Sequence, residues 1–429
     1  MTATAAPRIA EEVAPRLRAA RVAARVLARS AAEERNRALA SVAAALERDA
    51  DVIAAANADD LADAGRAVAR GELAAPLLQR LALDAAKVRG LAGAVRQMAV
   101  LDDPIGRRTL HRELDDGLVL ERVTCPIGVV GVIFESRPDA LVQIAALAIK
   151  SGNGAVLKGG REARRSNRAL FDTIRKAVDD TGLPGGALVL LEDRTDVAAL
   201  LDADGDVDLI IPRGSNSLVR WVQDHTRIPV LGHAEGVCHL YIDRSADPAK
   251  AVAVAVDSKV QYPAACNAVE TILVHAEAAP RLLARLTEAL RAEGVEVRAG
   301  EDPEDWGIEF GDLTVAVRVV GSLDEAVAHI NRHGSRHTDA IVTEDESARD
   351  RFFADVDAAG VFWNASTRFA DGFRYGFGAE VGISTGRLAP RGPVGLDGLV
   401  TYKYRLLGDG HVVASYSGPG ARAFTHRDL

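Results

Sequence analysis

The sequence feature that most constrains the fold is a repeated alternation of short apolar strands and helical segments. Apolar runs at 129–134 and 155–157 are separated by a helix-like segment at 140–149, and the alternation continues to residue 211. It starts again at 239 and runs to 363. Strands that alternate with helices favour a parallel sheet covered by helices on both faces. The chain is therefore predicted to be an α/β protein with two such units.

The regions outside this alternation have different patterns. Residues 8–100 are predicted to be helical, with a break at 57–60 and a loose end at 90–93. Residues 118–123 alternate apolar and charged side chains, as a half-buried strand does, and the tail after Leu399 also predicts an extended strand. Because a lone strand leaves its backbone groups unpaired, the tail is expected to join a sheet edge, in this chain or in another subunit.

Composition narrows the functional class. The chain has 52 Lys and Arg against 61 Asp and Glu, a net charge of −9, so a strongly basic surface for nucleic acid is not expected. No run of 18 apolar residues occurs, so no transmembrane helix is predicted. The three cysteines form no CxxC pair, which argues against a zinc ribbon or a disulfide framework and suits the cytoplasm. The N-terminus is rich in Ala and Arg like a transit peptide, but its acidic residues favour amphipathic surface helices.

Cys266 is the strongest single candidate for a catalytic residue. It follows Pro263 and two alanines and precedes an apolar strand, so there is space around the sulfur in a loop that enters a strand. A thiolate attacks carbonyl and acyl carbons. The alternative is a buried structural cysteine, which suits Cys125 and Cys238 better because both lie in or beside apolar strands. On local sequence alone, both interpretations of Cys266 remain open.

Two glycine-containing turns between a strand and a helix are candidate phosphate-binding or ribose-binding sites. One spans 151–161, with Lys158 just before a helix, and the other spans 210–216. If both strands belong to one parallel sheet, both turns lie at its carboxyl edge, where ligands bind. The GxGxxG and Walker patterns are absent, so an ordinary turn is the alternative for each. The arginines within 161–165 either contact a 2′-phosphate or form a solvated helix face.

Two further polar clusters have alternative interpretations. His329, His333 and His337 are spaced by four, which suits a metal site on a helix, but a glycine interrupts the helix and the histidines could instead cap its end. The segment 364–369 is rich in donors, and together with 135–139 it could recognise a charged substrate, since Arg pairs well with carboxylates. Both segments could equally be hydrogen-bonded loops.

Six motifs follow one another along the chain, at 134–139, 157–163, 211–216, 263–271, 364–369 and 378–385. Together they resemble the gamma-glutamyl phosphate reductases, a family within the aldehyde dehydrogenase superfamily. The residues of these motifs are similar to those in the reductase half of plant bifunctional pyrroline-carboxylate synthase, but no kinase half is present. The chain therefore resembles the stand-alone reductase.

The resemblance implies an NADPH-dependent reduction of L-glutamyl 5-phosphate to L-glutamate 5-semialdehyde with release of phosphate. This reaction is the second step of proline biosynthesis from glutamate. The resemblance places Cys266 at the nucleophile position, where its thiolate would form a thioester before hydride transfer. The backbone N–H of Cys266 is the first candidate donor to the developing oxyanion.

The resemblance also implies roles for residues within these motifs, and it implies no metal. The cofactor-binding candidates are Lys158, Gly159, Arg161, Pro212, Arg213, Gly214, Ser215 and Glu309. The oxyanion and substrate candidates are Glu135, Arg137, Asp139, Asn267, Asn364, Ser366, Thr367 and Arg368.

The implied architecture is an aldehyde dehydrogenase-like fold in three parts. A Rossmann-type NADPH-binding domain is expected at 1–111 and 130–234, and a catalytic domain at 235–395. A β oligomerisation arm is expected at 112–129 and 396–429. An exposed edge of this kind predicts a homodimer or larger assembly. The labile acyl phosphate also suggests a transient partnership with glutamate 5-kinase.

Two positions depart from the pattern of the family. Many members have Asn where this chain has Asp139, and an ionised Asp can only accept hydrogen bonds. The Glu base of hydrolytic aldehyde dehydrogenases would fall near Gly232, and Glu235 is offset from that place. A missing base suits an enzyme whose thioester must not be hydrolysed. The alternative functions are a hydrolytic aldehyde dehydrogenase and a non-catalytic paralogue, and the intact Cys266 and Lys158 speak against the second.

Overall fold

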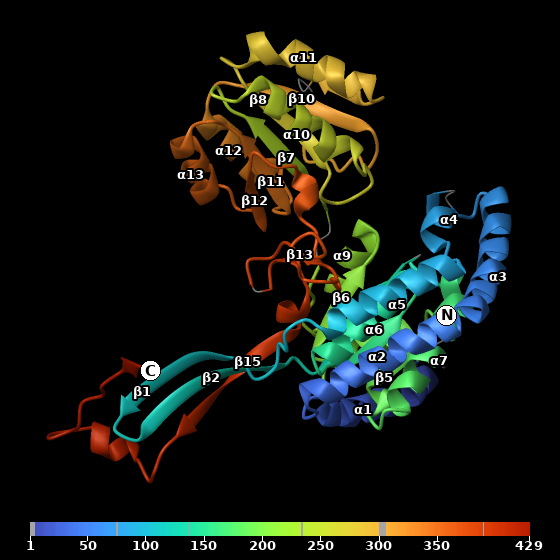
Figure 1. Ribbon diagram of the computed structural model, residues 1–429, viewed down its shortest axis with the longest axis vertical. Helices are drawn as coiled ribbons and strands as arrows, with labels where there is room; N and C mark the ends of the chain where they lie inside the picture. The colour runs from blue at the N-terminus through green and yellow to red at the C-terminus, as the bar shows by residue number, and fades with distance from the viewer. Residues whose placement is uncertain (1–4, 74–75, 136, 233–234, 300–305, 389) are drawn as a thin grey trace. The chain divides into compact units, whose positions relative to one another are not determined.

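The computed structural model describes residues 5–73, 76–135, 137–232, 235–299, 306–388 and 390–429. The chain forms two compact units (Figure 1). The first comprises Met1–Gly214, Asp224–Val230 and Gly395–Leu429, and the second comprises Ser215–Gln223 and Leu231–Val394. Each contains a parallel sheet with helices, so the predicted α/β fold class is confirmed. The three-part domain division stays a prediction, and Ala234 at one of its boundaries lies outside the described residues.

The first unit contains a four-stranded parallel sheet. Its order is β5 (Leu188–Leu191), β4 (Gly154–Lys158), β3 (Val129–Phe134) and β6 (Leu209–Arg213). Nearly every residue of these strands is buried, which explains their continuous Val, Ile and Leu runs. The strand order reverses between β3 and β6. Their carboxyl ends are therefore the place where a parallel sheet forms a ligand crevice.

Helices of the first unit pack against this sheet and against one another. They are α1 (Ala5–Leu27), α2 (Ala32–Arg48), α3 (Ala50–Ala69), α4 (Pro76–Leu81), α5 (Ala85–Ala99), α6 (Pro138–Lys150), α7 (Arg164–Asp179) and α8 (Asp196–Leu201). Helix α1 contacts β3, β4 and β5. Helices α6 and α7 also contact this sheet, α2 packs against both of them, and α5 packs against α6. Within the described part of the chain, no helix is long and apolar enough to cross a membrane.

The predicted break at 57–60 and loose end at 90–93 are wrong. Helix α3 continues through Asn57 and Asp60 because both side chains bind groups outside their own helix. Asn57 Nδ2 donates to Ser166 Oγ at 3.0 Å, and Asp60 Oδ2 accepts the Ser166 N–H at 2.8 Å. These polar side chains therefore do not compete for the backbone of α3. Gly90 and Gly93 lie inside α5, where they lower helix propensity without ending the helix.

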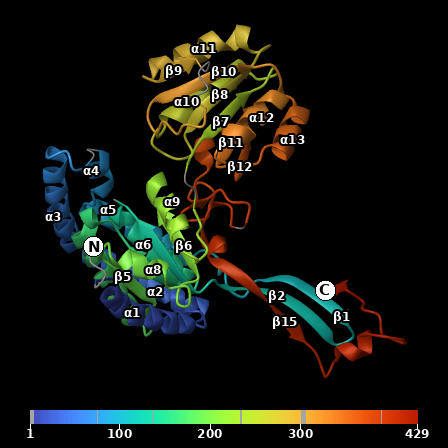
Figure 2. The ribbon, with the colours of Figure 1, turned by 180° about the vertical axis from the view of Figure 1, so that it is seen from behind.

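A second sheet of the first unit is antiparallel. Its order is β15 (Val400–Leu407), β2 (Leu118–Pro126), β1 (Arg108–Asp115) and β16 (Arg427–Asp428), and Figure 2 shows β15, β2 and β1 side by side. The two predicted strands thus pair with each other. Strand β1 was not predicted because its residues are mostly polar. We call this sheet the arm sheet.

The second unit contains a six-stranded parallel sheet. Its order is β12 (Gly360–Trp363), β11 (Thr338–Val342), β7 (Cys238–Ile242), β8 (Val269–His275), β10 (Thr314–Val320) and β9 (Glu296–Ala299). The helices that follow its strands are α10 (Pro248–Val260), α11 (Ala279–Ala292), α12 (Leu323–His333) and α13 (Glu346–Asp355). The remaining described α-helix is α9 (Asn216–Asp224), and the remaining strands are the short antiparallel pair β13 (Ile383–Ser384) and β14 (Gly392–Pro393).

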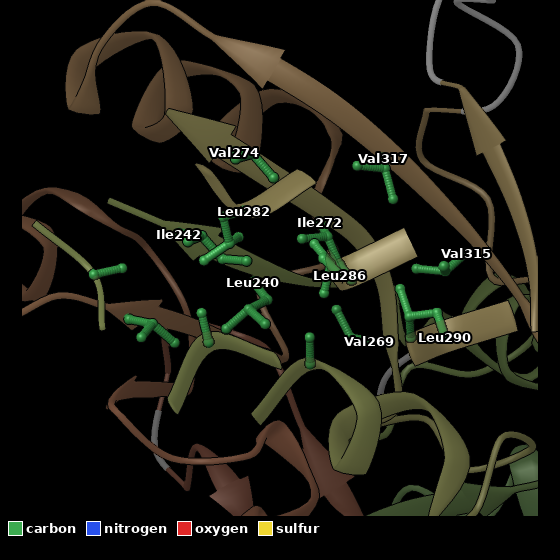
Figure 3. Close-up of a cluster of buried hydrophobic side chains, with 14 of the residues drawn as sticks. Leu240, Ile242, Val269, Ile272, Val274, Leu282, Leu286, Leu290, Val315 and Val317 are labelled. Atoms are coloured by element: carbon green, nitrogen blue, oxygen red, sulfur yellow. The ribbon is translucent and has the colours of Figure 1, made fainter. Parts of the chain in front are cut away.

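Alternation along β8 builds an apolar core on both faces of this sheet. Ile272 and Val274 belong to the cluster that includes Leu286 of α11 (Figure 3), whereas Leu273 belongs to a second cluster with Phe352 of α13. Successive strand residues point to opposite faces, so β8 is packed on both sides. Each such side chain contributes about 1.5–3 kcal/mol by its burial. The loop that carries Cys266 thus leads directly into a firmly held strand.

Candidate active site

Cys266 lies in the loop between α10 and β8. Two turns shape this loop, with the Ala265 N–H bonded to the Tyr262 oxygen at 3.1 Å and the Ala268 N–H bonded to the Ala265 oxygen at 2.8 Å. Gly236, just before β7, approaches the same backbone: a Cβ placed there would lie 2.2 Å from the Cys266 oxygen. Only glycine allows this approach, so the loop rests against the start of the central strand.

The surroundings of Cys266 favour its neutral thiol. Burial raises the pKa of Cys266 to about 12, the carboxylates of Glu309 and Glu380 add to the rise, and the Arg368 cation opposes it. The residue keeps partial solvent exposure. Because the thiolate is the nucleophile, catalysis needs a further change at this site that removes the thiol proton.

The structure brings Asn267 and Arg368 to the Cys266 loop. Asn267 Nδ2 donates to the Ala370 oxygen at 2.8 Å, while its Oδ1 is buried and has no partner among the described residues. Arg368 Nε donates to Gln261 Oε1 at 2.9 Å. Arg368 is itself buried, and burial lowers its pKa. The Cys266 loop thus carries a buried amide oxygen without a partner among the described residues, and a buried cation from the 364–369 segment contacts the start of this loop.

The other predicted residues of the 364–369 segment are held by protein contacts. Ser258 Oγ lies 3.2 Å from Ser366 Oγ and also accepts the Thr367 N–H at 3.2 Å. Asn364 has a left-handed backbone with φ of 53°, and its side chain binds both backbone groups of Thr343 at 3.0 Å. The Asn364 amide is thus used in supporting the loop, whereas Ser366 and Thr367 lie beside the end of α10.

Two acidic residues near β7 have different partners. Glu309 Oε2 accepts the Gly236 N–H at 2.9 Å, which connects a cofactor-binding candidate to the glycine that contacts Cys266. Glu235, the residue offset from the hydrolytic base position, is paired with Arg220. This carboxylate, which stands outside the base position near Gly232, is thus engaged by a guanidinium.

In the first unit, Lys158 and Gly159 lie at the carboxyl end of β4. Lys158 is buried, its Nζ donates to the Gly159 oxygen at 2.7 Å, and burial lowers its pKa. A Cβ at Gly159 would lie 2.1 Å from Asn167 Nδ2, so a larger residue there would require the Asn167 side chain to shift. Asn167 Oδ1 is buried without a partner among the described residues. This corner offers a cation and an unused acceptor to a polar ligand.

The arginines of 161–165 differ in their contacts. Arg165 pairs with Asp60 and Asp63, and Arg164 lies 3.6 Å from Glu192. Arg161 is exposed and has no ion pair within 4 Å among the described residues. Arg161 is therefore the arginine of this group with a guanidinium still available to an anion.

The turn after β6 lies beside the end of β3. Phe134 pairs with Arg213, and the Glu135 N–H donates to the Arg213 oxygen at 3.1 Å. The predicted residues Pro212 to Ser215 thus extend from a buried strand into an exposed turn at the start of α9. Arg137 and Asp139 lie at the start of α6 in the same unit.

The histidines of α12 form a ring cluster with His239. The ring centroids of His329 and His333 are 4.7 Å apart, and those of His329 and His239 are 5.4 Å apart. Burial lowers the pKa of His329 to about 3. No group of three or more potential metal ligands is found among the residues that the structure describes.

Sequence reasoning missed two residues that frame the Cys266 loop. Lys259 Nζ and Glu270 Oε2 form an ion pair at 2.7 Å, and both side chains are fully buried. The available signal was Glu270 itself, a lone charge inside an apolar strand on the carboxyl side of the cysteine.

Comparisons with known proteins relate the chain to a family and a fold. The profile of the aldehyde dehydrogenase family matches residues 2–314. The chain is 57% identical to gamma-glutamyl phosphate reductase from Parasynechococcus marenigrum, with 99% of each chain covered. The crystal structure of gamma-glutamyl phosphate reductase from Thermotoga maritima has a TM-score of 0.90 at 39% identity, covering 94% of this chain and 99% of that one. An acetylating aldehyde dehydrogenase from Geobacillus thermoglucosidasius shares the fold, at 18% identity and a TM-score of 0.68 with coverage of 96% and 99%.

Proposed function

Because the chain belongs to the gamma-glutamyl phosphate reductases of the aldehyde dehydrogenase family, we propose that it reduces L-glutamyl 5-phosphate to L-glutamate 5-semialdehyde with NADPH. Phosphate is released, and the reaction is the second step of proline biosynthesis. The observation that carries the proposal is Cys266, held on a shaped loop beside Arg368 in a chain that matches its relatives over nearly their full length. The cytoplasm is the proposed location.

Cys266 is the proposed nucleophile. Its sulfur attacks the acyl carbon of the substrate, the carbon–sulfur bond forms, and the bond to the phosphate oxygen breaks with the electron pair leaving on phosphate. Arg368 favours the thiolate because its cation opposes the rise of the Cys266 pKa. Gly232 stands where hydrolytic aldehyde dehydrogenases carry their Glu base, and a missing base suits a thioester that must not be hydrolysed.

The oxyanion of the reacting carbonyl needs donors close to Cys266. The backbone N–H of Cys266 is the proposed donor, with Asn267 beside it. The buried side chains of Ser366, Thr367 and Arg368 are proposed substrate contacts on the same unit. Asn364 and the first-unit residues Glu135, Arg137 and Asp139 are retained as further proposed substrate contacts.

The first unit carries residues that fit a nicotinamide dinucleotide. Asn167 Oδ1 is a buried acceptor without a partner among the described residues, beside a glycine that permits close backbone approach. When bound, NADPH supplies the hydride that reduces the thioester. Arg161 is proposed to bind the 2′-phosphate because its guanidinium is exposed and outside any short ion pair of the described chain. The other proposed cofactor contacts are Lys158, Gly159, Pro212, Arg213, Gly214, Ser215 and Glu309.

The proposed assembly is a homodimer or larger oligomer formed through the arm sheet. Strand β15 is an edge strand whose side chains are almost all exposed, including Tyr402, Tyr404 and Leu406. Open edges of this kind favour pairing with another chain. A transient partnership with glutamate 5-kinase is also proposed, because the acyl phosphate is labile.

The reverse reaction tests the proposed function. The purified protein is mixed with L-glutamate 5-semialdehyde and NADP, with and without inorganic phosphate, and nicotinamide reduction is followed for the wild type and Cys266→Ala. Phosphate-dependent reduction that is lost in the variant supports the thioester route. Turnover without phosphate would instead assign a hydrolytic dehydrogenase, and no turnover in any mixture would overturn the enzymatic assignment.

A further inference from the structure

The ion pair between Lys259 and Glu270 is unusual in its burial. Both side chains have 0% exposure, and Nζ lies 2.7 Å from Oε2. No other Lys or Arg ion pair within the described residues has both partners fully buried. Because removing two charges from water is costly, such a pair contributes little to stability by itself. Its retention in the core points to a role other than stability.

The pair stands at the two ends of the Cys266 loop. Lys259 is the penultimate residue of α10, and Glu270 is the second residue of β8. The segment from Val260 to Val269 between them contains Cys266. The ion pair therefore joins the ends of this segment and fixes where the loop leaves the helix and enters the strand.

Glu270 also connects to the opposite side of the cysteine. Its Oε1 accepts the Gly311 N–H at 3.5 Å, a long hydrogen bond. Two residues before Gly311, Glu309 accepts the Gly236 N–H at 2.9 Å, and Gly236 contacts the Cys266 backbone. A continuous set of contacts thus leads from Lys259 through Glu270 and the 309–311 segment back to Cys266.

We propose that Lys259 and Glu270 are positioning residues for Cys266. They hold the loop and the 309–311 segment in the arrangement that keeps the thiol enclosed and aimed at the substrate. The proposal uses the proposed function only in taking Cys266 as the nucleophile. Neither residue is assigned contact with substrate or cofactor.

The test uses the double variant Lys259→Met with Glu270→Leu. Single substitutions leave one buried charge without its partner and are expected to unfold the chain, whereas the double variant removes both charges with similar volume. The matched control is Lys250→Met with Glu344→Leu, because Lys250 lies on the same helix and its 2.9 Å ion pair with Glu344 is exposed. The melting temperature reports the fold of each variant.

Two readouts measure the position of the cysteine. The first is the rate at which iodoacetamide alkylates Cys266, measured by peptide mass spectrometry, with the fully buried Cys238 as an internal reporter of unfolding. The second readout is kcat together with KM for NADPH. We expect the double variant to keep its melting temperature and its Cys238 protection, while Cys266 alkylation rises about tenfold and kcat falls about tenfold. KM for NADPH should stay within about twofold.

Two outcomes would overturn the proposal. One is a folded double variant whose Cys266 alkylation and kcat both stay within about twofold of the wild type. The other is equal exposure of Cys238 and Cys266, which would assign the pair to the fold alone. Alkylation needs no substrate, so the alkylation measurement tests the proposal even if the wild type does not turn over L-glutamate 5-semialdehyde.

Discussion

At the scale of single residues, Gly236 decides how close the chain can come to Cys266. A Cβ at this position would meet backbone atoms of Cys266 at 2.2–2.7 Å, and no side-chain rotation can relieve such a contact. We expect Gly236→Ala to lower the free energy of unfolding by about 1–3 kcal/mol and kcat by about tenfold or more. Urea unfolding measures the change in the free energy of unfolding, and steady-state kinetics measure the change in kcat. The control is Gly205→Ala, where a Cβ meets nothing within 4 Å; an equal loss in both variants would contradict the explanation.

The charge of Glu309 is a single-residue determinant of the pKa of Cys266. It is the largest charged contribution to the raised pKa of Cys266, after burial. Glu309→Gln should therefore lower the pKa of the thiol and raise the thiolate fraction at any given pH below it. We expect the curve of alkylation rate against pH to move to lower pH, with the rate still rising about tenfold per pH unit. Glu288→Gln, an exposed change on α11, should leave the curve in place, and a shift to higher pH in Glu309→Gln would refute the prediction.

At the scale of elements, Asp60 ties α3 to the start of α7. Its carboxylate has 3% exposure and accepts hydrogen bonds from the Ser166 N–H and Oγ at 2.8 and 2.7 Å. Asp60→Ala leaves these buried donors unpaired and should cost about 2–4 kcal/mol of unfolding free energy. On the same helix, Asp63→Ala removes an exposed ion-pair partner of Arg165 and should cost less than about 1 kcal/mol. Urea denaturation of both variants checks the ranking, which an equal cost would disprove.

At the scale of the whole molecule, the arm sheet has an open apolar edge. Tyr404 and Leu406 are about 60% exposed and lie on one face of β15, because strand side chains alternate. If β15 forms the proposed interface, Tyr404→Asp with Leu406→Asp should convert the oligomer to monomers without a change in melting temperature. Sedimentation velocity measures the mass. Lys403→Ala on the other face is the control, and an unchanged mass in the double variant would place the interface elsewhere.

How far the sequence predicts this protein differs between its elements. The apolar runs and helical segments from 129 to 363 predicted the strands and helices there except β9, because hydrophobic periodicity is a local property and β9 is short and mostly exposed. Strand β1 was missed since its residues are mostly polar and it is held by pairing with β2 and β16. The break expected in α3 was wrong because the partners of Asn57 and Asp60 lie on elements distant in the chain.

The sequence by itself determined the α/β class, the cysteine of interest and the order of motifs that relates the chain to its family. These follow from residue type and spacing, which need no contacts between distant segments. Only the tertiary structure decided that Glu309 reaches Gly236 and that Lys259 and Glu270 meet in the core. Such contacts depend on which segments the packed sheet brings together. A buried charge is tolerated only where a partner compensates the cost of its desolvation, and the sequence does not show which partner that is.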